Sequence, residues 1–137
     1  MDTMELRNLD WEVLLKAAHS VLDNAYAPYS GIRVAAAVMT GSGQIYTGCN
    51  IENSSFSLTI CAERNALFHA LAHGEKKFLA MAVVTDSERV ISPCGSCRQV
   101  LAEFAIEMTV IFSNPQETKL FTVAQLLPHT FTLKHDA

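Results

Sequence analysis

Three of the four cysteines in the sequence fall in two short motifs that have the spacing of a metal site. The first motif is Cys61–Ala62–Glu63, and the second is Pro93–Cys94–Gly95–Ser96–Cys97. Two thiolates separated by two residues can reach one tetrahedral ion, and Cys61 offers a third sulfur ligand from farther up the chain. A site with three protein ligands leaves the fourth position open for water, which is typical of catalytic rather than structural zinc.

Two residues beside Cys61 add a proton carrier and a positive charge. Glu63 follows Cys61 by two positions, so on a helix it points away from the thiolate and need not be a ligand. It can instead hold a proton and move it beside a metal-bound water. Three thiolates with one zinc ion leave a net negative charge, which Arg64 can offset by hydrogen bonds to sulfur. A zinc ligand, one residue and a glutamate, followed later by Pro-Cys-x-x-Cys, is the signature of zinc deaminases.

The same cysteines have simpler interpretations. They could be buried structural thiols, because free cysteine is often buried. A structural zinc site would need a fourth protein ligand and has no use for Glu63. A thioredoxin-type redox pair would not need Cys61. Cys49, which ends a predicted strand, is expected to be a core or interface thiol, and the five histidines form no ligand-like cluster along the sequence.

The apolar periodicity predicts elements that place both motifs at the starts of helices. We expect a first helix from Trp11, capped by Asp10, to the turn at 27–31, and further helices at 61–73, 97–104 and 123–127. We expect a β-hairpin of 34–39 and 44–48 and further strands at 78–85, 108–113 and 119–122. The segments 50–59 and 86–93 are expected to be loops. Backbone N–H groups and the helix dipole at such N-termini stabilise thiolate charge. The element order favours a three-layer α/β/α sandwich with a mixed five-stranded sheet, formed by a single domain over residues 1–137.

The composition limits the classes of protein that remain. The chain has 137 residues, of which 50% are hydrophobic and 18% are charged, so it can bury a core and is not disordered. The formal net charge of −4 gives no basic surface for a polyanion. The longest apolar run, 78–84, is far too short to span a membrane. Charged residues interrupt the N-terminal region in which a signal peptide would have its apolar core. We therefore expect a cytoplasmic protein with reduced thiols.

Taken together, the motifs resemble the small cytidine deaminase family, the homotetrameric type with three cysteine ligands. The resemblance runs from about Ala25 to Phe131. It is carried by the segments 27–30 (Ala-Pro-Tyr-Ser), 48–53 (Gly-Cys-Asn-Ile-Glu-Asn), 61–64, 92–99 and 126–128 (Leu-Leu-Pro). Each segment alone is a weak signal, whereas their combination is highly specific.

The resemblance implies a zinc-dependent hydrolase that deaminates free cytidine and 2′-deoxycytidine to uridine and 2′-deoxyuridine, with release of ammonia, in pyrimidine salvage. Cys61, Cys94 and Cys97 would bind one zinc ion per subunit. Glu63 would take a proton from the zinc-bound water and pass it to ring N3. Homotetramers with shared active sites, a nucleoside substrate and no nucleic acid or membrane partner are also implied.

The resemblance further assigns residues around the substrate. Asn50 and Glu52 would bind the ribose 3′-hydroxyl, because an amide and a carboxylate can match its donor and acceptor character. The other implied contacts are the backbone at Ala62 for the base, the carbonyl near Ser92 for the leaving amine, Ser54 and Phe56 near the 5′ end of the sugar, Ile32 beside the base, Phe131 over the base of a neighbouring subunit, and Arg64 behind the metal ligands.

The sequence departs from the family pattern near the expected pocket. The family usually has an aromatic residue in place of Ile32, glycine in place of Ala35 and Thr59, tyrosine in place of Phe56, and proline in place of Ser57. These departures leave the chemistry intact and bear on the preferred substrate. We hypothesise that Ile32 widens the pocket beside the base, so that bulkier C4 or C5 substituents are tolerated.

Three rival functions remain open. Another cytosine-bearing compound, such as the nucleoside antibiotic blasticidin S, could be the substrate, although Asn50 with Glu52 favours a plain ribose. Editing of DNA or RNA needs basic channels, and ten Lys and Arg against fourteen Asp and Glu argue against it. A non-enzymatic zinc interaction module would keep its function after Glu63→Ala.

Overall fold

A mixed five-stranded sheet forms the centre of the molecule. The computed structural model describes residues 11–89 and 92–133. The strands are β1 (Val34–Thr40), β2 (Ile45–Cys49), β3 (Phe78–Thr85), β4 (Thr109–Ser113) and β5 (Thr118–Thr122), in the spatial order β2-β1-β3-β4-β5. Only β3 and β4 are parallel, and the other neighbouring pairs are antiparallel. The sheet is therefore mixed, as the sequence predicts.

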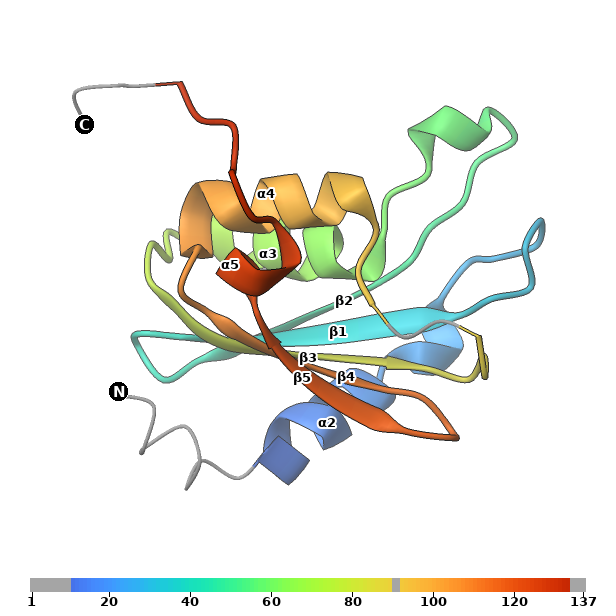
Figure 1. The fold of residues 1–137 in the computed structure, drawn as a ribbon. Coiled ribbons are helices and arrows are strands. Elements are labelled where there is room, and N and C mark those ends of the chain that lie inside the picture. Colours follow the sequence, from blue (N-terminus) through green and yellow to red (C-terminus); the bar gives the residue numbers. More distant parts are fainter. Residues whose placement is uncertain (1–10, 90–91, 134–137) are drawn as a thin grey trace.

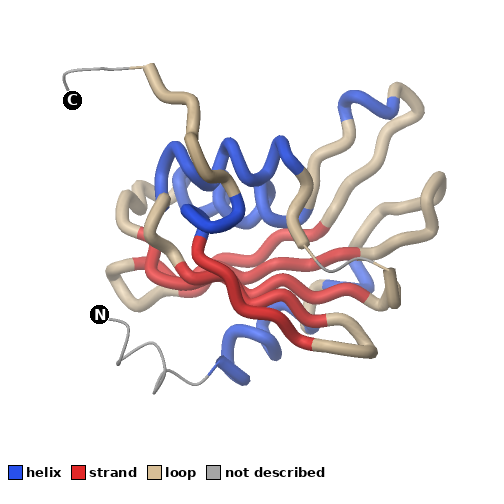
Figure 2. The backbone as a smooth tube through the Cα atoms, in the orientation of Figure 1, coloured by secondary structure: helices blue, strands red, loops and turns tan. Residues whose placement is uncertain are grey.

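Helices cover both faces of this sheet (Figures 1 and 2). On one face lies α2 (Trp11–His19), and on the other lie α3 (Ala62–Ala72), α4 (Gly95–Ala105) and the short α5 (Val123–Leu126). Two 3₁₀ turns, η1 (Leu22–Asn24) and η2 (Phe56–Leu58), lie in the connections. The predicted three-layer α/β/α sandwich is confirmed. No helix in the described part of the chain is long and apolar enough to cross a membrane.

The apolar run of β3 is buried on both sides of the sheet. Met81 and Val83 belong to the core under α3 and α4, whereas Ala80 and Ala82 belong to the core under α2. Because side chains alternate along a strand, a strand covered on both faces is apolar at every position. The pattern that predicts this strand from sequence is thus explained by two separate cores.

A close approach of α3 to β2 sets the position of the first cysteine motif. A Cβ on Gly48 would lie 2.3 Å from the backbone nitrogen of Ala66 and 2.9 Å from the carbonyl oxygen of Ala62. The Asn65 side chain also donates to the Cys49 carbonyl at 2.8 Å. Only a residue without a side chain lets the helix lie this close to the strand. The first turn of α3 is thereby held beside the residues that follow β2.

Two helix boundaries differ from the prediction by more than one residue. The first α-helix ends at His19, and Leu22–Asn24 continues as a 3₁₀ turn; the Ser20 hydroxyl donates to the Ala17 carbonyl where the helix ends. Helix α4 begins at Gly95 rather than Cys97, because the Cys94 sulfur caps the helix and accepts from the Cys97 N–H. The predicted cap Asp10 lies outside the described residues.

Candidate functional site

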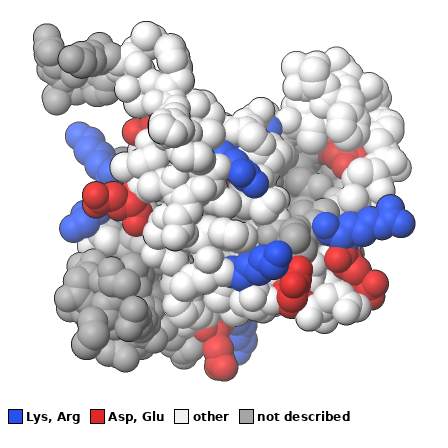
Figure 3. Space-filling view, in the orientation of Figure 1, with Lys and Arg blue, Asp and Glu red and all other residues white. Residues whose placement is uncertain are grey.

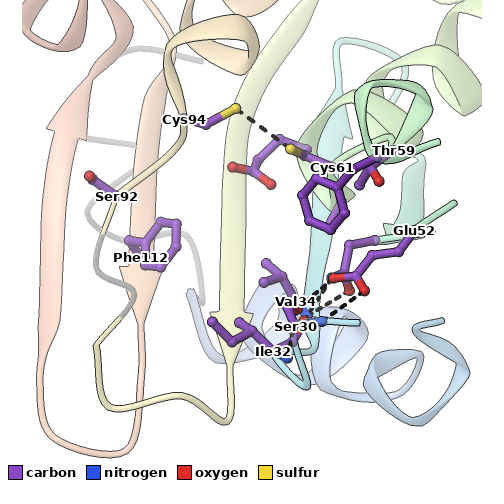
Figure 4. A pocket seen from close by; sticks show the side chains of 13 residues that line it. Ser30, Ile32, Val34, Glu52, Thr59, Cys61, Ser92, Cys94 and Phe112 are labelled. Carbon is purple, nitrogen blue, oxygen red and sulfur yellow. Dashed lines mark hydrogen bonds between the residues drawn. The ribbon is translucent and has the colours of Figure 1, made fainter. Parts of the chain in front are cut away.

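Two helix N-termini bring three sulfur atoms together. Cys61 is the N-cap residue of α3, Cys94 is the N-cap residue of α4, and Cys97 lies in the first turn of α4. Their sulfurs all lie within 4.8 Å of one another, and Cys61 Sγ is 3.5 Å from Cys94 Sγ (Figure 4). In the described part of the chain this is the one such group of three or more metal-ligating side chains. The predicted cysteine cluster is present.

The surroundings of the sulfurs favour negative charge. A hydrogen bond with the Cys97 thiol, and then the Arg64 guanidinium, lower the pKa of Cys61 to about 5 against the effect of burial. The same contact with Cys61, together with burial, raises the pKa of Cys97. Three thiolates this close repel one another, so a cation between them is needed before all three can ionise. Three soft sulfur ligands fit a zinc ion and leave its fourth position open.

Arg64 lies directly behind this cluster. Its Nη2 is 3.6 Å from Cys61 Sγ and 3.4 Å from the carbonyl oxygen of Thr59. Its Nε is buried and has no hydrogen-bond partner among the described residues. A buried donor beside sulfur fits a site that carries excess negative charge. Arg64 thus lies beside the sulfur of Cys61, and its role toward the metal ligands stays a prediction.

Glu63 is a buried carboxyl group beside the sulfurs. Its side chain is only 4% exposed, and it lines the same pocket as Cys61 and Cys94. Burial raises the pKa of Glu63 to about 7, and the nearby Cys61 charge acts in the same direction. A carboxyl group with such a pKa can both accept and release a proton near neutral pH.

Cys61, Cys94 and Glu63 line a cavity of about 250 Å³ near the carboxyl ends of β2 and β4. This is below the usual volume of pockets for drug-sized ligands, so a small molecule fits it. None of the described lining residues is lysine or arginine. The lining residues are Ser30, Ile32, Val34, Asn50, Glu52, Phe56, Thr59, Cys61, Ala62, Glu63, Ser92, Cys94 and Phe112 (Figure 4).

Two buried polar side chains form the end of the cavity next to β1 and the loop before it. The Glu52 carboxylate accepts from the Ser30 hydroxyl and from the backbone N–H groups of Tyr29 and Ser30. Burial opposes ionisation, but these hydrogen bonds hold the pKa of Glu52 below its usual value. The Asn50 side chain accepts from the Val34 N–H and donates to the Ile32 carbonyl, at 2.9 and 2.8 Å. Both side chains are fixed before any ligand binds.

Most of the other predicted substrate residues reach the cavity, and two do not. Ile32, Phe56, Ala62 and Ser92 line it with the residues above. Ser54 is not among the lining residues, and its hydroxyl is 2.6 Å from the Tyr29 hydroxyl. Phe131, which is 69% exposed, lies on the C-terminal segment, where its carbonyl accepts from Gln99. Its predicted contact involves a neighbouring subunit and stays a prediction.

Several further residues that line or support the cavity are not among those predicted for the site. Val34 and Phe112 line the cavity from strands, and Ser30 binds Glu52. Ser30 belongs to the segment 27–30 that carries the family resemblance, whereas Val34 and Phe112 have no sequence signal beyond a position near the end of a strand. Arg98 supports the site from outside. It donates to the Pro93 carbonyl, the Ser92 hydroxyl and the Leu126 carbonyl, and so holds the loop that carries Cys94.

The arrangement is suited to metal-assisted hydrolysis of a small neutral molecule. One end of the cavity offers a fixed amide and carboxylate, the other offers Cys61 and Cys94 of the cysteine cluster, and the buried Glu63 carboxyl group lines the same cavity. A metal-bound water near a buried carboxyl group is the usual way to produce a nucleophile at neutral pH.

Comparison with known proteins agrees with this geometry. Residues 10–113 match the family model described as the cytidine and deoxycytidylate deaminase zinc-binding region. A cytidine deaminase of Sporosarcina psychrophila is 46% identical over 129 residues, covering 90% of this chain and 93% of that protein. One of Halalkalibacterium halodurans is 44% identical over 126 residues, covering 90% and 96%.

Solved structures give the same result. The crystal structure of a cytidine deaminase from Burkholderia pseudomallei superposes with a TM-score of 0.83 at 43% identity, covering 88% of this chain and 98% of that one. That of Mycobacterium tuberculosis gives 0.77 at 37% identity, covering 91% and 99%. The family match, the relatives and the cysteine cluster lead to one conclusion: the chain belongs to the zinc-binding cytidine and deoxycytidylate deaminase family.

Proposed function

We propose that the protein is a zinc-dependent cytidine deaminase that hydrolyses free cytidine and 2′-deoxycytidine to uridine and 2′-deoxyuridine, with release of ammonia. The observation that carries this proposal is the buried Glu63 carboxyl group beside three clustered sulfurs, inside a cavity with a fixed polar end. The names of the relatives support the same substrate class.

Each side chain at the metal end has a defined task in this reaction. Cys61, Cys94 and Cys97 would hold one zinc ion, which would supply a water of lowered pKa. Glu63 would take one proton from that water and deliver it to ring N3 while the water oxygen bonds to C4. Glu63 would then take the second proton from the new C4 hydroxyl and pass it to the amino nitrogen, so that the bond from C4 to nitrogen breaks, C4 becomes a carbonyl and ammonia leaves. Arg64 offsets the charge of the thiolates.

The remaining cavity residues bind the nucleoside. Asn50 and Glu52 hold the ribose 3′-hydroxyl, because the hydrogen bonds from Ser30 and Tyr29 keep the Glu52 carboxylate an acceptor. The Ala62 backbone receives the base, and the carbonyl near Ser92 accepts from the amine. Ser54 and Phe56 lie toward the 5′ end of the sugar. A plain ribose is thereby favoured over the altered sugar of blasticidin S.

The charge distribution supports a nucleoside rather than a nucleotide or a nucleic acid strand. Two carboxyl groups and no described cation line the cavity, so a 5′-phosphate would meet repulsion there. On the face shown in Figure 3, basic and acidic side chains are interspersed. Strand binding needs a continuous basic groove. A small uncharged substrate is the better match, and pyrimidine salvage in the cytoplasm is the setting that we propose for it.

We also propose a single catalytic domain over residues 1–137 and a homotetramer with shared active sites. One continuous sheet with both faces covered supports the single domain. Large apolar side chains are exposed in the loops before β1 and after β2 and on the C-terminal segment, and exposed apolar surface of this kind supports the assembly. These side chains are Tyr26, Tyr29, Ile51, Phe56, Leu58, Phe131 and Leu133.

The zinc ligands can be tested against the fourth cysteine. We expect Cys61→Ser to lose most of the bound zinc and the activity, because oxygen is a poor substitute for a thiolate. Cys49→Ser, which changes a half-buried thiol outside the cluster, should retain one zinc ion per chain. Metal analysis of the purified proteins measures both. Equal zinc content in the two variants would contradict the assignment.

The role of Glu63 separates an enzyme from a zinc interaction module. Glu63→Ala should keep its fold and its zinc, and should lose turnover by about two to four orders of magnitude, as expected on removal of a general acid–base group. Glu63→Gln, which keeps the size of the side chain but removes the ionisable carboxyl group, should behave similarly. The measurement is the absorbance change on deamination of cytidine, deoxycytidine, cytosine, CMP and blasticidin S. Failure of the zinc-loaded wild type on all five refutes the proposal.

The tolerance of modified cytidines can be tested at Ile32, which lines the cavity. Ile32→Phe should lower kcat/KM for N4-methylcytidine relative to cytidine by about tenfold, because a larger ring fills the space beside the base. Deamination of N4-substituted cytidines by the wild type and Ile32→Phe is compared in one assay. Comparable turnover by both proteins would refute the hypothesis.

The shared active sites can be tested from the assembly itself. Sedimentation velocity of the zinc-loaded protein should give one species of four chains. Phe131→Ala should lower turnover and leave the free energy of unfolding of the chain nearly unchanged, because this side chain is exposed within its own chain. A monomer with full activity would contradict the proposal.

A further inference from the structure

We propose that Phe112 is a specificity-determining residue whose ring limits the size of the substituent at C5 of the pyrimidine. The inference rests on the proposed function and concerns one wall of the same cavity. Nothing in the motif pattern of the sequence identifies Phe112, which the sequence places only in a strand.

The cavity has two facing walls. Figure 4 shows Cys61 and Thr59 on one side and Phe112 with Ser92 on the other, and Cys94 lies at the end between them. The first wall continues into Ala62 and Glu63, because these residues form the first turn of α3 after Cys61. The second wall consists of β4 and the loop that leads to α4. A flat ring in the cavity therefore has one flank toward α3 and the other toward Phe112.

The chemistry fixes which flank of the base faces which wall. In cytidine, N1 carries the sugar and C4 lies opposite N1 across the ring. The sugar end belongs at Asn50 and Glu52, and C4 belongs at the three sulfurs. Glu63 must reach N3 to deliver its proton, so the N3 flank faces α3. The C5 flank is the remaining one, and it faces Phe112.

Phe112 cannot move aside to admit a larger group. Its side chain is 2% exposed, and it packs in the core cluster that also contains Val83 and Leu101. It lies on β4, where it pairs with Val83 of the neighbouring parallel strand. Displacing a close-packed side chain of this kind destabilises the core, so the ring keeps its position. Phe56, the other aromatic residue of the cavity, is 57% exposed and lies on a loop, so it offers no comparable limit.

This assignment divides the cavity between Ile32 and Phe112. Figure 4 places Ile32 beside Val34 and Ser30, toward the sugar end, whereas Phe112 lies below Ser92. The additional space attributed to Ile32 therefore does not extend to C5.

The experiment compares 5-methylcytidine with cytidine in the zinc-loaded protein. For Phe112→Leu, the ratio of kcat/KM for 5-methylcytidine to that for cytidine should rise by about tenfold, the usual effect of removing a steric conflict with one methyl group. The ratio is taken within one preparation, so a partly unfolded sample does not change it. Because Phe112 is buried, Phe112→Met is made in parallel as the variant closer in volume, and it should raise the ratio in the same direction.

Phe121→Leu is the matched control. Phe121 packs against the same core from β5, pairs with Val110 of β4 and does not line the cavity. Its ratio should equal that of the wild type. An unchanged ratio in both Phe112 variants, or an equal rise in Phe121→Leu, overturns the role of Phe112. Absence of cytidine turnover by the wild type would instead refute the proposed function on which it rests.

Discussion

The site depends on keeping several acidic groups close together inside a folded protein. Three cysteine sulfurs lie within 4.8 Å of one another, and the Glu63 carboxyl group is buried beside them. Their mutual repulsion is offset by two helix N-termini, by Arg64 and by the zinc ion that the family binds. The fold must therefore start two helices at the same place, and the sheet topology provides this.

The strand directions explain why both helices begin at one edge of the sheet. Strand β1 is antiparallel to β2 and β3, and β3 is parallel to β4. The carboxyl ends of β2, β3 and β4 consequently lie at the same edge. Helix α3 follows β2, and α4 follows β3, so both N-termini point into the space beyond that edge. Ligands bind at this place in open α/β sheets. Gly48 completes the arrangement by letting α3 lie against the backbone of β2.

The substrate end of the cavity shows how polar groups are fixed before binding. Asn50 and Glu52 each bond to the loop before β1, so their burial is compensated and their orientation is set. Arg98 does the same for the loop at Ser92 and Pro93. Such preorganisation reduces the entropy lost when a small ligand binds. The sequence contains all of these residues, yet the partners of Asn50 and Glu52 lie 16 to 23 residues away along the chain, so no local pattern reveals these pairs.

The sequence alone determined the fold class, the strands and the chemistry of the metal end, because hydrophobic periodicity and the spacing of three cysteines and Glu63 are local signals. It could not show that Cys94 caps α4 and starts that helix two residues early, since a cap is a hydrogen bond within the folded chain. Likewise Ser30 and Phe112 acquire their places only when β1, β3 and β4 come together. The tertiary structure decided the walls of the cavity, because walls are made by contacts between residues that are far apart in sequence.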